Sequence, residues 1–162
     1  MSEINLFNTQ TEISIRLLTI ISHSKKSLNL QELIYYDYLT LYYGDVDSNY
    51  NNLHPSNPHH SIEYILKRTL INESLKLLLS KGLIEVLVTS DGINYKANSF
   101  TINFLSCFES NYFELLKKNS VLVTEHFNTY SITELTSYFN QNIGKWKGEF
   151  ETEVLFRGKY NE

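Results

Sequence analysis

Apolar residues recur at helical spacing along the first half of the chain. Their period predicts a first helix over about residues 10–22 and a second helix that starts at Leu30. The polar residues 23–29 between them are expected to form a short turn. A third helix is predicted from about Ser61 to Lys81, and Gly82 is expected to end it.

The second predicted helix is apolar on almost every side, because Tyr35 and Tyr36 cover faces that its main apolar stripe leaves open. Such a helix is typically buried between other elements. Asp37 lies on the buried face, and a carboxylate there needs a partner. Arg16 and Arg68 are the candidate partners.

A β-hairpin is predicted to follow the third helix. Residues 83–89 are β-prone, Asp91-Gly92 is a strong short signal for a hairpin turn, and residues 93–97 are expected to return as the second strand. Three helices followed by a hairpin are the element order of a winged helix. We therefore predict a mainly α protein with a winged helix-turn-helix fold.

The remaining pattern is helical again and ends in a charged tail. A short helix and a longer one ending near Phe127 are predicted. Ser131 and Glu134 form an S-x-x-E capping box that opens a last helix, which Gly144 is expected to close.

These elements imply a winged-helix domain with a C-terminal helical extension. We expect the winged helix over residues 1–98 with a long loop inserted at 44–60, helices packed on it over 99–144, and a tail over 145–162. The loop spans 17 residues and contains both prolines of the chain. Ordered loops of this length are uncommon unless they serve a function.

The same loop concentrates imidazoles and carboxylates, the side chains of His54, His59, His60, Asp45 and Asp47. Such groups could bind zinc or manganese. Their spacing lacks a pattern that aims several ligands at one point. We therefore expect no metal site, and we expect His54 and His59 to form hydrogen bonds that pin the loop.

Composition favours protein partners over nucleic acid. The net charge is −4, whereas a protein that grips a duplex usually has a basic excess that neutralises phosphates. Neither a signal peptide nor an apolar run of about 20 residues is apparent, so a cytoplasmic protein without a membrane partner is expected.

A DNA-binding transcription regulator is the alternative function. The third helix and the hairpin supply five basic residues, which are Lys67, Arg68, Lys76, Lys81 and Lys96. Four carboxylates in the same stretch leave a net charge of only +1. A recognition helix can read bases with a few side chains, so this alternative stays open.

Catalysis finds no support in the sequence. The chain contains neither G-x-S-x-G nor a G-x-x-x-x-G-K-[ST] phosphate loop. Cys107, the single cysteine, lies on an apolar stretch where a buried, inert thiol is expected. We therefore expect a protein that is not an enzyme and uses no cofactor.

Several phrases of the sequence resemble one protein family. They are LNLQELIYYDYLTLYYGDV at 28–46, LHP at 53–55, NPHHS at 57–61, LLSKGLIEV around Gly82, YKANSFTINFLSCFESNY at 95–112 and IGKWKGEFE around Trp146. In this order they resemble the middle component of three-component systems with an ABC-type ATPase, similar to the small subunit of Lamassu antiphage systems.

The resemblance implies a bacterial antiphage or anti-plasmid defence complex of three subunits. Its partners would be an SMC-like ABC ATPase and an effector, often a nuclease, and the middle subunit would bridge them and meet DNA only through the complex. Trp146 and Phe150, in a charged segment, suit a partner anchor or packing on the domain equally well. The expected partner-binding residues are Asp45, His54, His59, Arg68, Trp146 and Phe150.

Overall fold

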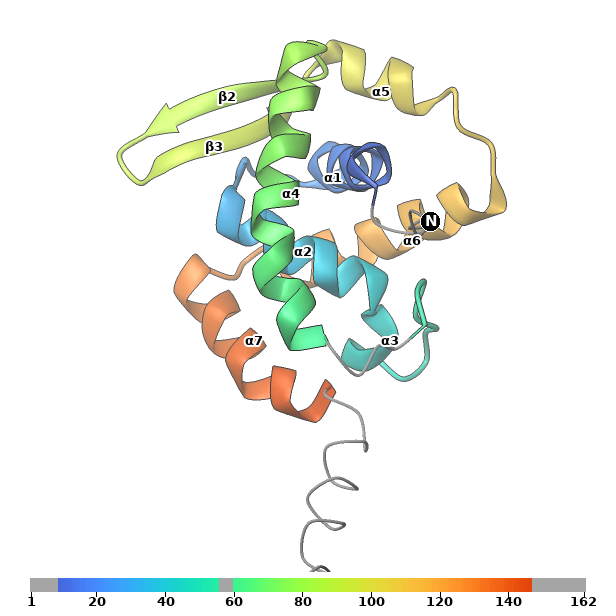
Figure 1. Cartoon of the computed structure of the whole chain (residues 1–162), viewed down its shortest axis with the longest axis vertical. Helices are drawn as coiled ribbons and strands as arrows, with labels where there is room; N and C mark the ends of the chain where they lie inside the picture. Colours follow the sequence, from blue (N-terminus) through green and yellow to red (C-terminus); the bar gives the residue numbers. More distant parts are fainter. Residues whose placement is uncertain (1–8, 56–59, 147–162) are drawn as a thin grey trace, which may run out of the picture.

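The computed structural model describes residues 9–55 and 60–146, with side chains over 9–55 and 67–146. These residues form seven helices and one three-stranded sheet (Figure 1). In chain order the elements are α1 (Gln10–His23), β1 (Leu28–Asn29), α2 (Leu30–Leu41), α3 (Tyr43–Val46), α4 (His60–Ser80), β2 (Ile84–Thr89), β3 (Gly92–Ala97), α5 (Ser99–Leu105), α6 (Asn111–His126) and α7 (Ile132–Trp146). The prediction of a mainly α protein with a hairpin is confirmed.

Helix α2 is the centre of the molecule, surrounded by α1, α4, α6 and α7 (Figure 1). A capping box starts it: the Asn29 side chain accepts a hydrogen bond from the Glu32 N–H, and the Glu32 side chain accepts one from the Asn29 N–H. Every residue from Glu32 to Leu41 is buried, so the predicted burial of this helix is confirmed.

The sequence predicted only a turn for the polar stretch before α2, but the structure differs. The stretch contains β1, where Leu28 pairs with Tyr95 and Asn29 pairs with Asn94 of β3. The sheet is antiparallel, with the order β1-β3-β2, so β2 lies at an edge. Two residues are too few to show an alternating pattern, which is why β1 was missed.

The predicted hairpin is confirmed, but its two-residue loop is Ser90-Asp91, one residue before the predicted Asp91-Gly92. Gly92 begins β3 at a φ of 120°, a backbone conformation that favours glycine. Gly82, at a φ of 68°, follows α4 as predicted. The hairpin projects from the helical body on one side (Figure 1).

The C-terminal helices cover the other sides of the core. Helix α6 packs on α1 and α2, and α7 packs on α2. The predicted capping box of α7 is confirmed, because the Ser131 N–H donates to the Glu134 carboxylate at 2.8 Å and the Glu134 N–H donates to the Ser131 hydroxyl at 3.2 Å.

Three further local predictions were wrong. Gly144 does not close α7, which continues to Trp146, because a single glycine weakens a helix without having to end it. Cys107 is exposed rather than buried, since α5 ends at Leu105 and the cysteine falls in the turn behind it. The first residues of the 44–60 loop belong to the short helix α3.

Candidate functional site

Beneath the loop that follows α3 lies a network of charged side chains. The Arg16 guanidinium of α1 donates from Nε to Asp37 Oδ1 at 2.7 Å and from Nη2 to Asp37 Oδ2 at 3.0 Å. Both side chains are fully buried. Lys67 of α4 is buried as well, and its Nζ lies 3.6 Å from Asp37 Oδ2. Of the two predicted partners of Asp37, Arg16 is therefore the correct one.

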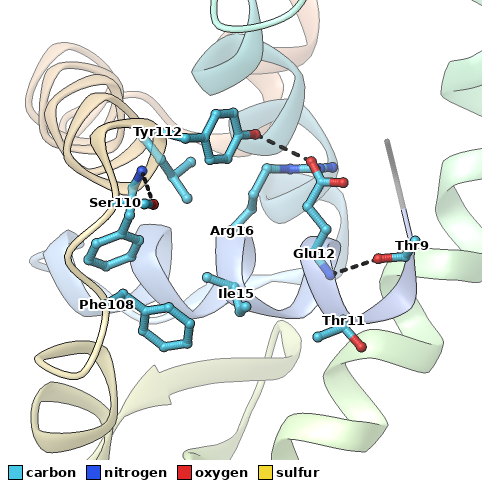
Figure 2. Close-up of a pocket in the computed structure, with 10 residues that line it drawn as sticks. Thr9, Thr11, Glu12, Ile15, Arg16, Phe108, Ser110 and Tyr112 are labelled. Carbon is cyan, nitrogen blue, oxygen red and sulfur yellow. Dashed lines mark hydrogen bonds and ion pairs between the residues drawn. The ribbon is translucent and has the colours of Figure 1, made fainter. Parts of the chain in front are cut away.

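A second layer connects this pair to the loop and to α6. Glu12 Oε1 accepts hydrogen bonds from Arg16 Nη1 at 3.1 Å and from the Tyr112 hydroxyl at 3.3 Å. His54 Nε2 lies 2.9 Å from the Tyr112 oxygen and 3.5 Å from Glu12 Oε1. Figure 2 shows Tyr112 and Glu12 pointing toward each other beside Arg16. Because the Tyr112 proton goes to Glu12, the His54 Nε2–H donates to the tyrosine oxygen.

Burial and neighbouring charges set the protonation of these groups. Burial tends to raise the pKa of Asp37, but Arg16 and Lys67 outweigh it and hold that pKa below its usual value. Burial, with the Arg16 charge second, lowers the pKa of His54, so the imidazole is neutral near pH 7. Burial raises the pKa of the Tyr112 hydroxyl, which therefore stays protonated.

The network is balanced in charge, with two carboxylates, Glu12 and Asp37, facing two cations, Arg16 and Lys67. The network joins α1, α2, α4, α6 and the loop, because each of these helices contributes one or two polar side chains to it. Its direct effect is to hold these elements together.

A cavity of about 450 Å³ opens on one side of this network (Figure 2). Glu12 and Tyr112 form its polar wall, and Ile15 and Phe108 form part of its apolar wall. A neighbouring cavity of about 500 Å³ shares Ile15 and Phe108 and is almost entirely apolar, with Leu77 of α4 on its far side. Together they make a groove along α1 between α4 and the α5–α6 connection, with its polar end at Glu12 and its apolar end at Leu77.

The predicted site residues lie in three separate places. Asp45 Oδ1 accepts a hydrogen bond from Asn52 Nδ2 at 3.0 Å, and the Asp45 carbonyl accepts one from Trp146 Nε1 at 3.2 Å. Trp146 also stacks on Tyr38, with 5.5 Å between ring centroids. Asp45 and Trp146 are thus brought together, whereas His54 is buried in the charge network.

The other predicted residues lie elsewhere. Arg68 is exposed on α4 and donates to Gln31 Oε1 at 2.9 Å. His59 and Phe150 lie outside the described residues.

Within the described ranges, no group of three or more His, Cys, Asp or Glu side chains is placed to hold a metal ion. No helix in these ranges is both long and apolar enough to cross a membrane.

Sequence reasoning missed three members of the network, Glu12, Lys67 and Tyr112. Two of them had a signal. Glu12 and Arg16 are four residues apart on one helix, the spacing at which opposite charges meet. Lys67 precedes buried Ile71 by four residues, which places it on the buried stripe of α4. Tyr112 carried no such signal, since its partners come from other elements.

Fold and site define a small, mainly helical protein with a neutralised internal charge network and a groove beside it. The chain belongs to the ABC-three component (ABC-3C) system Middle Component 2 family, whose model matches residues 6–149. It is thus a middle component of an ABC-three component system, which implies other components as partners. Comparison with curated proteins and with solved structures found no match.

Proposed function

We propose that this chain is the non-enzymatic middle subunit of a Lamassu-like antiphage or anti-plasmid complex. It bridges an SMC-like ABC ATPase and an effector subunit, a nuclease in this proposal, and it acts in the cytoplasm. The observation that carries the proposal is the family match over residues 6–149. DNA reaches the subunit only through the assembled complex.

A winged helix is the proposed framework for this role. Helices α1, α2 and α4 followed by the β2–β3 hairpin have the element order of that fold. We assign the winged helix to residues 1–98, the helical extension to 99–144 and the tail to 145–162. The contacts of α6 with α1 and α2 support an extension that packs on the first domain.

The proposed docking surface is the loop over 44–60 together with the end of α7. His54 acts from inside, because its bond to Tyr112 fixes the part of the loop up to residue 55 on the helical body. The Asp45 side chain holds the loop by accepting from Asn52 Nδ2, and its backbone carbonyl accepts from Trp146 Nε1 at the end of α7. The remaining contact residues of the proposal are His59, Arg68 and Phe150. A surface fixed in advance loses little conformational entropy on binding, which favours docking.

The test is assembly with the neighbouring components. The double variant Asp45→Ala with His54→Ala is expected to keep its helical circular dichroism spectrum and to co-purify more weakly with the ATPase component. Ser90→Ala, at the exposed tip of the hairpin, is the matched control and should assemble normally.

Two outcomes contradict the docking surface. Normal assembly of a folded double variant excludes the loop as the surface that binds the ATPase. Loss of the helical spectrum means that Asp45 and His54 serve only to tie the loop to its own helices.

A further inference from the structure

The β2–β3 hairpin is amphipathic, and its apolar face extends beyond the body. Residues paired across antiparallel strands point to the same face. The pairs Ile84–Ala97, Val86–Tyr95 and Val88–Ile93 therefore share one face, and Leu28 of β1 continues it. This face is apolar throughout. The opposite face is polar except for Leu87.

Along β2 this apolar face emerges progressively into solvent. Ile84 is 3% exposed, Val86 is 39% exposed and Val88 is 81% exposed. Ile93, the partner of Val88, is 54% exposed. The row begins in the core and ends in water, so its outer half presents apolar surface that the described helices do not cover. Exposed apolar surface of this kind marks an interaction site.

The backbone of β2 is also open along its outer edge. In the order β1-β3-β2, which covers the strands of residues 9–55 and 60–146, this strand has a neighbour on one side only. Just before β2, the chain is held by residues that follow β3, because the Thr101 hydroxyl donates to the Leu83 carbonyl at 2.6 Å and the Asn98 amide donates to the Gly82 carbonyl at 2.8 Å. From Glu85 to Thr89 every residue is exposed. This open stretch is centred on Leu87, and it contains neither the Lys nor the Pro that commonly protects edge strands.

We propose that a second copy of this chain pairs with β2 through this edge, antiparallel and about a two-fold axis at Leu87. In that register Leu87 faces Leu87 of the second copy, Val86 faces Val88, and Glu85 faces Thr89. Paired residues then lie on matching faces, as antiparallel pairing requires.

Self-complementarity is the reason for choosing a second copy. The sequence Val86-Leu87-Val88 is symmetric about its centre, so a two-fold axis places apolar side chains opposite each other on both faces. The single charge of β2, Glu85, meets a threonine rather than another glutamate, so no like charges oppose each other. Each exposed tip comes to lie beside the base of the other hairpin, where the apolar row is buried. A C2 interface of this kind uses the same patch on both subunits.

Charge complementation at position 87 tests the register. The purified chain should show a dimer by sedimentation velocity whose fraction rises with protein concentration. Leu87→Lys and Leu87→Glu should each weaken dimerisation at least about tenfold, because two like charges then face each other across the axis. An equal mixture of the two variants should recover the dimer, because Lys then faces Glu.

Leu115→Lys is the matched control, since Leu115 is an exposed leucine on α6. It should dimerise like the unchanged chain, and all variants should keep the same helical circular dichroism spectrum. A chain that stays monomeric at every concentration overturns the proposal. So does full dimerisation of each single variant, and a mixture that stays monomeric overturns the two-fold register. The experiment uses this chain alone, so its result is independent of assembly with other components.

Discussion

At the scale of single residues, the stability of the core depends on how buried charges are neutralised. Asp37 has a guanidinium and an ammonium beside it, and none of the three side chains is significantly exposed. Removing one charge from such a group leaves the others buried without compensation, which costs more than the intact group contributes. The carboxylate of Asp37 is the member shared by both cations.

Asp37→Asn should lower the free energy of unfolding by about 3–5 kcal/mol, because the buried Arg16 and Lys67 then lose the carboxylate that both of them contact. Urea denaturation at pH 7 followed by circular dichroism measures this loss. Glu114→Gln is the control, since Glu114 lies on an exposed pair 3.9 Å from Lys117, and it should change stability little. Equal effects of the two substitutions would show that the buried network contributes no more than a surface pair.

The same substitution should change the response to acid. The folded pKa of Asp37 lies below its ordinary value of about 4, so its contribution is present above that pH and is lost as the pH falls through the lower folded pKa. The free energy of unfolding of the unchanged chain should fall as the pH is lowered below about 4. For Asp37→Asn, the free energy of unfolding should depend less on pH over the same range.

At the scale of the elements, glycines show how one residue type has opposite effects in different backbone conformations. Gly82 follows α4 at a φ of 68°, where a Cβ is strained even though no atom lies within 4 Å of it. Gly144 lies within α7 and has the same open space around its Cβ position, without a positive φ. The two positions therefore differ in conformation rather than in crowding.

Gly82→Ala should destabilise the chain by about 1 kcal/mol, because alanine is disfavoured in the left-handed region. Gly144→Ala should stabilise it by about 0.5–1 kcal/mol, because alanine is the better residue inside a helix. Thermal unfolding of both variants beside the unchanged chain measures the two shifts. Shifts of the same sign would contradict the assigned conformations.

At the scale of the whole molecule, the distribution of charge is unfavourable for gripping a nucleic acid. The net charge is −4, and Lys67 is buried against Asp37. Lys96 Nζ lies 3.4 Å from Glu85 across the hairpin. The tip of the hairpin carries Val88 and Ile93 where a DNA-binding wing would use basic residues to reach phosphates.

The chain should therefore bind duplex DNA weakly and without sequence preference at physiological salt. Fluorescence anisotropy with several labelled duplexes of unrelated sequence measures this. A dissociation constant of about 10⁻⁸ M or tighter for one sequence would instead support a transcription regulator. Arg68→Ala serves as a comparison, because Arg68 is an exposed basic residue of α4, the helix that would read DNA in such a regulator.

The candidate site was only partly predictable. Asp37 could be recognised as a buried carboxylate, and Arg16 as one of its two candidate partners, because both lie on predicted helices. Tyr112 could not, since it lies 100 residues from Glu12 in the chain. The exposure of Cys107 depended on where α5 ends, and helix ends are weakly specified by periodicity.

The sequence by itself determined the order of helices and hairpin, because apolar period, capping residues and turn glycines act over a few neighbouring residues. Ser131 with Glu134 and the hairpin closed at Gly92 are examples. Only the tertiary structure decided which charges are inside. Lys67 is a partner of Asp37 because α4 packs on α2, and β2 is an edge strand of the described sheet because β1 pairs with β3. Both depend on packing between distant segments, for which a local pattern contains no information.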